Sequence, residues 1–228
     1  MKRIISLALV FIMASASVFA LEKFVDISPD NPYYEAIEYV YDNELMEGCS
    51  AERFEPDAYV NRAMVVTVLW RVENCPSYLC VTNFVDVPYR SWYGESVTWA
   101  EGEITKGYGE WGTTDYVFKP LDLATKEQLW TMLWRYAEMN KLTELSENVD
   151  MSAVADIDKV SDYAIDAVKW GYANGLIKTD ENGCIDPKGY ISRGEFAAYI
   201  KDFVDAFDFE VGIATVDRIK KMQNAVQE

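Results

Sequence analysis

The amino-acid sequence predicts an all-α protein of three helix-loop-helix repeats that pack about a pseudo-threefold axis around a central helical bundle. Three observations support this prediction. A short apolar motif recurs with an aspartate at positions 26, 86 and 156, apolar residues at helical spacing follow each motif, and in each copy a proline precedes a basic residue by six positions. No copy has enough amphipathic surface to be stable alone, so we expect the second helices of the copies to bury their apolar faces together.

The first helix of each copy is predicted by an apolar stripe that follows the aspartate motif. The stripes are Ile37 with Val40, Val97 with Ala100, and Val168 with Gly171. Trp99 and Trp170 fall within these helices, and we expect both to lie in the core. A glycine at position 48 or 107 would end the helix through a positive φ angle, whereas the third copy has threonine at position 179 and a glycine at position 175.

The second helix of each copy is predicted to begin at a basic residue, six positions after the loop proline. The helix starts are Arg62, Lys126 and Arg193. Ser192 with Glu195, and Thr125 with Gln128, have the spacing of a capping box. Asn61 can cap its helix alone, and because Met64 cannot reciprocate we expect the first copy to have the weaker cap.

These patterns divide the chain into a signal peptide, three repeats and a tail. We predict a signal peptide at residues 1–20, because a basic start is followed by a short apolar stretch and small residues. The repeats then occupy residues 21–79, 80–150 and 151–207, and a C-terminal tail of residues 208–228 is a candidate for docking a protein partner. We therefore expect an exported protein without an inserted membrane helix.

The charge balance limits the partners of this chain. The formal net charge is −17, and removal of Lys2 and Arg3 with the signal peptide makes it −19. Such a charge repels nucleic acid and anionic lipid. An anionic ligand would have to be bound by a few locally placed cations.

Four cysteines in an exported chain are expected to form disulfides rather than a metal site. Cys75 and Cys80 enclose a short loop and are the first predicted pair, which leaves Cys49 and Cys184 as a possible long-range pair. Zinc is disfavoured because the chain has no histidine, and we expect no metal and no cofactor.

Taken together, the three aligned copies resemble the S-layer homology (SLH) family, over roughly residues 23–207. The resemblance rests on the aspartate motif, the glycine in the middle of the repeat, and the helix start around each basic residue. It implies a three-repeat spindle whose grooves between repeats bind secondary cell-wall polysaccharide, often pyruvylated, without catalysis. It also implies a location in the cell wall, the S-layer or elsewhere on the cell surface, with the polysaccharide associated with peptidoglycan.

The resemblance implies a set of ligand-binding residues in the grooves. The helix-start arginines would bind the acidic sugar, with the lysine as a weaker equivalent, while the early aspartates and the aromatic residues after them would lie near the groove. These residues are Arg62, Lys126, Arg193, Asp26, Asp86, Asp156, Trp92 and Tyr163. An equally open reading is that the aspartates only bond nearby backbone amides in a turn.

Two other functions stay open. An envelope assembly or docking scaffold would use the repeats without sugar binding. A glycan-cleaving enzyme needs only a pair of carboxylates, which 38 acidic residues could supply, but the chain offers no histidine for acid-base work.

Overall fold

The computed structural model describes residue 21 and residues 23–77, 81–143 and 149–211. The predicted signal peptide, Cys80, part of the linker after the second copy and most of the C-terminal tail lie outside the described residues. Helices and loops make up the described chain, in which β-structure is limited to isolated bridges. None of the described helices is long and apolar enough to cross a membrane.

The chain forms two compact units. Of the described residues, unit 1 contains those up to residue 58 and residues 192–201, and unit 2 contains those between 59 and 191 and residues 202–211. Neither unit coincides with a predicted repeat, since the first copy contributes a helix to each. The predicted repeat boundaries and the pseudo-threefold spindle therefore stay predictions.

Unit 1 contains helix α2 (Tyr34–Asp42) and the beginning of helix α7 (Arg193–Phe207). Ile37 and Val40 of α2 are fully buried, as their helical spacing predicted. The start of α7 has the predicted capping box. The Glu195 amide donates to Ser192 Oγ at 3.1 Å, and the Ser192 amide donates to the Glu195 carboxylate at 2.9 Å.

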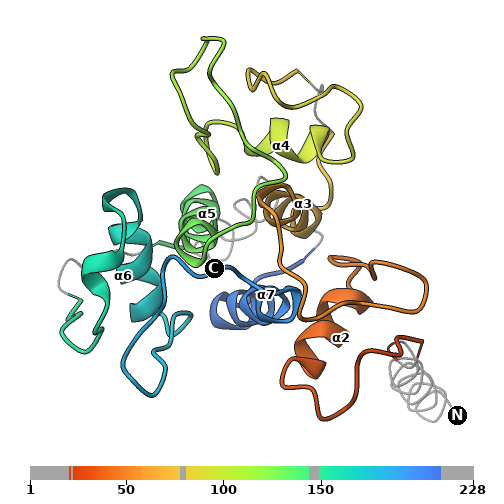
Figure 1. Cartoon of the computed structure of the whole chain (residues 1–228), viewed down its shortest axis with the longest axis vertical. Helices are drawn as coiled ribbons and strands as arrows, with labels where there is room; N and C mark the ends of the chain where they lie inside the picture. The colour runs from red at the N-terminus through yellow and green to blue at the C-terminus, as the bar shows by residue number, and fades with distance from the viewer. Residues whose placement is uncertain (1–20, 22, 78–80, 144–148, 212–228) are drawn as a thin grey trace, which may run out of the picture. The chain divides into compact units, whose positions relative to one another are not determined.

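Unit 2 contains helices α3 (Arg62–Val72), α4 (Gly94–Ala100), α5 (Lys126–Met139) and α6 (Ile165–Ala173). Two 3₁₀ turns, η1 (Ile157–Lys159) and η2 (Asp162–Ala164), precede α6. Helix α3 packs beside α4, and α5 packs beside α6 (Figure 1). Trp99 and Trp170 are buried as predicted, and Trp170 stacks on Phe207 with ring centroids 5.6 Å apart.

The helix starts of α3 and α5 agree with the sequence. Asn61 alone caps α3, where the Met64 amide donates to Asn61 Oδ1 at 2.9 Å. In α5 only the Gln128 half of the predicted capping box forms: the Thr125 amide donates to Gln128 Oε1 at 3.4 Å, whereas the buried Thr125 hydroxyl has no hydrogen-bond partner among the described residues.

The prediction that Gly48 and Gly107 end the first helices is wrong. Helix α2 already ends at Asp42 and α4 at Ala100, and the left-handed residues that follow them are Glu44 and Gly102. The two glycines are required by packing instead. A Cβ atom on Gly48 would lie 2.5 Å from the Phe24 ring, and one on Gly107 would lie 2.3 Å from the Phe84 ring.

Candidate ligand-binding site

Each basic helix start is bonded to the proline loop of another copy. The amides of Arg62 and Ala63 donate to the carbonyls of Asp122 and Pro120 in the second copy, at 3.0 and 2.9 Å. These two bonds satisfy amides that the first turn of a helix cannot pair internally.

The other two helix starts repeat this arrangement. Lys126 and Glu127 donate their amides to Gly189 and Pro187 of the third copy, and Arg193 and Gly194 donate theirs to Ala58 and Pro56 of the first copy. We call these three pairs of backbone bonds the hand-over contacts. They link the first copy to the second, the second to the third and the third to the first.

The three early aspartates hold the same proline loops in place. Asp26 accepts hydrogen bonds from the amides of residues 54 and 55, Asp86 from those of residues 118 and 119, and Asp156 from those of residues 185 and 186. All six bonds are between 2.7 and 3.0 Å long. The geometry therefore supports the turn-type reading of these aspartates, and their binding role stays a prediction.

The side chains of the two arginines follow one pattern, and Lys126 does not share it. Arg62 Nε donates to the carbonyl of Phe118 at 2.9 Å with its guanidinium 4.8 Å from the centre of that ring. Arg193 Nε likewise donates to the carbonyl of Phe54 at 2.8 Å, and its guanidinium lies 4.5 Å from the centre of the Phe54 ring. Lys126 has no Nε, and its ammonium lies 3.7 Å from Asp186. Recurrence of arginine at this position thus has a structural cause in addition to any ligand.

A pocket of about 350 Å³ opens beside Arg62 in unit 2. We call it the basic pocket, because three cationic side chains line it together with two tyrosines. Its wall comes from the start of α3, the segment after α4, one face of α5 and the turn η2. The lining residues are Arg62, Thr105, Lys106, Gly107, Tyr108, Gln128, Thr131, Met132, Arg135 and Tyr163.

Among the described residues, Arg62 is a buried cation without an acidic partner in ion-pair distance. Its exposed fraction is 4%, and the bond to Phe118 is its one side-chain hydrogen bond among the described residues. Within that part of the chain, no carboxylate oxygen lies within 4.0 Å of its guanidinium. Burial lowers the pKa of Arg62 from its usual value, opposed by Tyr108, Tyr163 and two aspartates. An arginine stays charged in proteins, so this pocket presents a desolvated positive charge.

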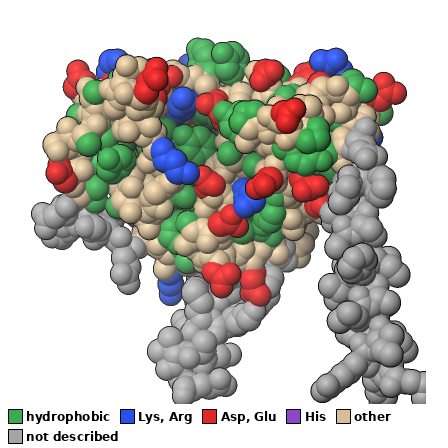
Figure 2. All heavy atoms as spheres, turned by 90° about the horizontal axis from the view of Figure 1, so that it is seen from below, with side chains coloured by type: hydrophobic (Ala, Val, Ile, Leu, Met, Phe, Trp, Pro, Cys, Tyr) green, Lys and Arg blue, Asp and Glu red, His purple; other side chains and the backbone are tan. Residues whose placement is uncertain are grey.

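Arg135 adds a second partly desolvated guanidinium to the pocket. It donates to the carbonyl of Ile104 at 3.3 Å, and burial lowers its pKa, against the opposing effect of Glu138. Lys106 is exposed at the rim. Asp and Glu side chains are spread over the face of the molecule in Figure 2, so three cations around one pocket stand out against an acidic surface.

Glu127 fixes the tyrosine wall of the basic pocket. Its carboxylate, 3% exposed as a residue, accepts hydrogen bonds from Tyr163, Ser161 and Lys188, the last at 2.6 Å. Burial alone would raise the pKa of Glu127, but the bonds from Lys188, Ser161 and Tyr163 outweigh it and the pKa is lowered. Burial and the bond to Glu127 raise the pKa of Tyr163. Both groups therefore keep their ordinary charge at neutral pH.

Of the sequence-predicted site residues, the basic pocket brings together Arg62 and Tyr163. Trp92 lies in a different hollow of unit 2, and Arg193 belongs to unit 1. Sequence reasoning missed Lys106 and Arg135. Arg135 follows Lys126 by nine positions on one helix, and Lys106 directly precedes Gly107, but neither base recurs in all three copies, so the repeat pattern did not single them out.

Among the described residues, Cys49, Cys75 and Cys184 are free thiols, so the possible Cys49–Cys184 pair is not formed, and burial raises the pKa of each thiol. Cys80 of the other predicted pair lies outside the described residues.

The family comparison agrees with the repeat pattern. The model of the S-layer homology domain matches residues 23–63 and 155–197, which contain the aspartate and the basic helix start of the first and third copies. The predicted family is therefore confirmed over these two regions. S-layer homology domains are cell-wall anchoring domains.

Three curated relatives match most of this chain. It is 27% identical to an amylopullulanase of Thermoanaerobacterium thermosulfurigenes. That match covers 81% of this chain and 10% of the amylopullulanase. The chain is 28% identical to exoglucanase XynX of Acetivibrio thermocellus and 27% identical to an endoglucanase of Bacillus sp. strain KSM-635, each over 78% of this chain. Those matches cover 16% and 18% of the two relatives, so the chain spans less than a fifth of each relative's length.

Proposed function

We propose that this chain is a noncatalytic envelope protein that binds an acidic, pyruvylated secondary cell-wall polysaccharide in the basic pocket. In this proposal the sugar carboxylate pairs with Arg62, while Lys106 and Arg135 bind neighbouring oxygens. Tyr108 and Tyr163 offer aromatic faces and hydroxyls to the ring. A guanidinium suits this task because its fork of N–H donors matches the two oxygens of a carboxylate.

One observation carries the proposal. The Arg62 guanidinium is desolvated on the wall of a pocket and has no carboxylate partner among the described residues. An unpaired buried charge destabilises a folded protein, and an anionic ligand removes that cost. This cationic pocket lies in a chain of net charge −17. We take the contrast as support for a ligand-binding role of Arg62 rather than that of a merely solvated cation.

The other copies have lost part of this cationic set. Glu47 of the first copy corresponds to Lys106, which places an acid where the pocket has a base. Asp202 of α7 corresponds to Arg135, and it forms an ion pair of 3.2 Å with Lys178. We therefore assign acidic-sugar binding to the basic pocket rather than to three equal grooves.

The three hand-over contacts support the proposed spindle, because each copy receives the helix start of another in a cyclic order. The enzyme names of the relatives do not argue for catalysis here, since the matches cover at most 18% of those proteins. The proposed place of action is outside the cell, at the wall.

Sedimentation with cell-wall sacculi tests the proposal. Protein beginning at residue 21 should pellet with sacculi that carry their polysaccharide, and should stay in solution with stripped sacculi. Joint replacement Lys106→Gln and Arg135→Gln should weaken binding about tenfold or more, because charge-assisted hydrogen bonds contribute about 1.5–3 kcal/mol each. Lys159→Gln removes an exposed cation outside the pocket and serves as the matched control.

Two further arms separate the alternatives. Removal of pyruvyl and other acidic groups from the sacculi should reduce pelleting to that of the pocket variant. Equal pelleting with intact and stripped sacculi would contradict the proposal, and the release of reducing sugar over time would indicate an enzyme.

A further inference from the structure

The second copy contains a hairpin that the other two copies lack. Thirteen positions separate Gly107 from the proline of this copy, whereas eight separate the corresponding residues of the first and third copies. The extra residues extend the loop into a hairpin of residues 108–117, which we call the acidic hairpin. Its base is closed by two backbone bonds, in which Tyr108 and Val117 each donate to the other's carbonyl at 2.8 and 2.9 Å. The repeat framework alone does not require this segment.

The tip of the acidic hairpin is a defined turn. The Thr113 amide donates to the carbonyl of Glu110 at 3.2 Å, and the Thr113 hydroxyl donates to the same oxygen at 2.5 Å. Gly112 has a φ angle of 81°, which is the value that a type II turn requires at its third residue. Trp111 therefore occupies the second position of a preformed turn, and such a segment loses little conformational entropy when it binds.

Trp111 projects from the molecule at this tip. Its side chain is 68% exposed, and a Cβ atom on Gly112 beside it would meet no other atom within 4 Å. Trp111 does not fill the basic pocket of its own chain, because it is not among the residues that line that pocket. Tryptophan is a frequent anchor of protein interfaces, and its position on a projecting turn makes Trp111 accessible to a second molecule.

The residues around Trp111 are acidic. Glu110 and Asp115 are both exposed, and residues 108–117 contain no lysine or arginine. The Thr113 hydroxyl donates a hydrogen bond to the Asp115 carboxylate, which fixes one of the two acids on the hairpin. A partner for this hairpin must therefore combine room for an indole ring with positive charge.

The basic pocket of unit 2 has both properties. Its volume is about 350 Å³, and a cavity of about 150 Å³ already holds a benzene ring. Arg62, Lys106 and Arg135 line it, and within the described part of the chain no carboxylate oxygen lies within 4.0 Å of the Arg62 guanidinium. Tryptophan is the aromatic side chain that attracts a guanidinium most strongly. Charge and size thus match the pocket to the hairpin.

We propose that the acidic hairpin of one copy of this chain binds in the basic pocket of a second copy. The Trp111 indole enters the pocket and lies against its guanidinium groups, while Glu110 pairs with Lys106 at the rim. Because hairpin and pocket are different surfaces, each copy can use both, and the contact extends into rows or rings of molecules instead of stopping at a pair. This inference uses only the shape and charge of the pocket, so it holds whether or not the pocket also binds sugar.

The net charge of the chain does not prevent this contact. Two copies of formal charge −17 repel each other, but at about 0.15 M salt the Debye length is about 8 Å, so charges far from the contact are screened. A single hairpin covers a small interface, and small interfaces are weak. We expect a dissociation constant on the order of 0.1 mM, which suffices where copies are concentrated on one surface.

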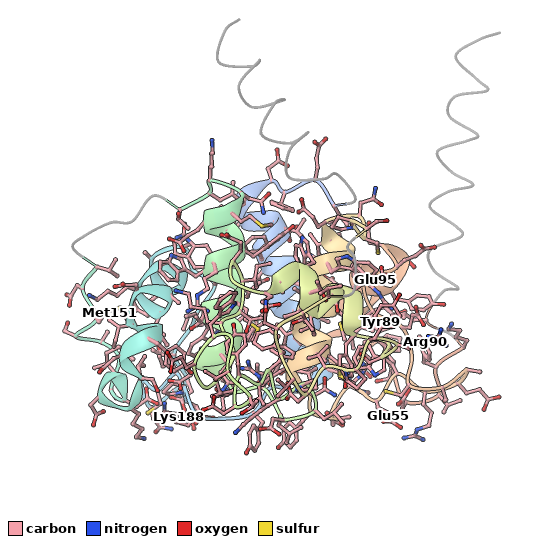
Figure 3. All side chains as sticks on the ribbon, turned by 90° about the horizontal axis from the view of Figure 1, so that it is seen from above. Glu55, Tyr89, Arg90, Glu95, Met151 and Lys188 are labelled. Atoms are coloured by element: carbon pink, nitrogen blue, oxygen red, sulfur yellow. The ribbon has the colours of Figure 1, made fainter. Side chains whose placement is uncertain are left out.

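Sedimentation velocity of protein beginning at residue 21 tests the proposal. The sedimentation coefficient of the parent chain should rise with protein concentration up to about 0.5 mM, which exceeds the expected dissociation constant. Trp111→Ala, and separately the joint replacement Lys106→Gln and Arg135→Gln, should each weaken self-association about tenfold or more. Tyr89→Ala is the matched control, because Tyr89 is a 69% exposed aromatic residue on the loop before α4, outside the hairpin and the pocket (Figure 3).

Mixing the two kinds of variant separates this contact from a symmetric dimer. Trp111→Ala keeps the pocket and the double variant keeps the hairpin, so an equimolar mixture should form pairs that neither variant forms alone. A parent chain that stays monomeric, self-association that survives Trp111→Ala, or a mixture that stays monomeric would each overturn the proposal. Binding of Trp111 to a different wall protein by a monomeric parent chain would also overturn it.

Sacculus sedimentation keeps this proposal distinct from the proposed function. At about 1 μM protein, where self-association of this strength is negligible, Trp111→Ala should pellet with polysaccharide-bearing sacculi as the parent chain does. The double variant should lose both self-association and pelleting. Loss of pelleting without loss of self-association, or the reverse, shows which of the two proposals fails.

Discussion

At the residue scale, the early aspartates show how one side chain can define a loop. Each carboxylate accepts two consecutive backbone amides with its two oxygens, and Asp156 does so while only 3% exposed. A carboxamide has one acceptor oxygen, so it can satisfy one of these amides and opposes the other with its own N–H donors.

Asp156→Asn should therefore destabilise the protein by about 1–3 kcal/mol, the cost of leaving a buried amide unpaired. Urea unfolding followed by circular dichroism measures the change. Asp158→Asn, on an exposed side chain of the next turn, is the control and should leave the midpoint unchanged. An unchanged midpoint for Asp156→Asn would mean that the loop holds itself in place.

Glu127 makes unfolding sensitive to acid. Its pKa is lowered in the folded state, so its stabilising contribution is complete above the unfolded value of about 4.5 and is lost as the pH falls through the folded value. The difference in unfolding free energy between the parent chain and Glu127→Gln should be largest near neutral pH and should shrink below about pH 4. Urea midpoints at several pH values test this, and a difference independent of pH would contradict it.

At the scale of single elements, helix starts were readable from the sequence and helix ends were not. A capping residue identifies a start locally, as at Asn61 and Ser192. The ends of α2 and α4 depend on where packing turns the chain. Gly48 and Gly107 do not end these helices but leave room for the rings of Phe24 and Phe84.

The element scale also explains what was missed in the candidate site. Arg62 and Tyr163 were predicted singly from the sequence, but Lys106 and Arg135 join them only through the packing of α5 beside the segment after α4. The hand-over contacts were not foreseen either, because backbone amides and carbonyls bond without any signature in residue type.

The cap of α3, which lacks a reciprocal side chain, can be improved. Met64→Glu would place a carboxylate at the position that Glu195 holds in α7, and would complete a reciprocal cap with Asn61 as well as favouring the positive end of the helix dipole. We expect a gain of about 0.5–1 kcal/mol in unfolding free energy. Met64→Gln is the control for charge, and a loss of stability in both variants would show that the methionine contributes more through packing.

At the scale of the whole molecule, net charge and ligand binding respond to salt in opposite directions. A chain of formal charge −17 repels itself, so screening should raise the thermal midpoint between about 20 mM and about 500 mM NaCl. Attraction between the basic pocket and an acidic polysaccharide should weaken over the same range. Thermal unfolding and sacculus sedimentation measure the two effects, and a midpoint that falls with salt would indicate that ion pairs dominate stability.

The hand-over from the third copy to the first has a consequence for synthesis. The carbonyl of Phe54 accepts a hydrogen bond from Arg193, which lies 139 positions later in the chain. A ribosome releases the N-terminal part first, so the first copy emerges with the carbonyls of residues 56 and 58 without these hydrogen-bond donors until the last helix follows. The first repeat to be synthesised is thus the last to complete its hydrogen bonds. A chain truncated before residue 193 would lack the donors to the carbonyls of residues 56 and 58.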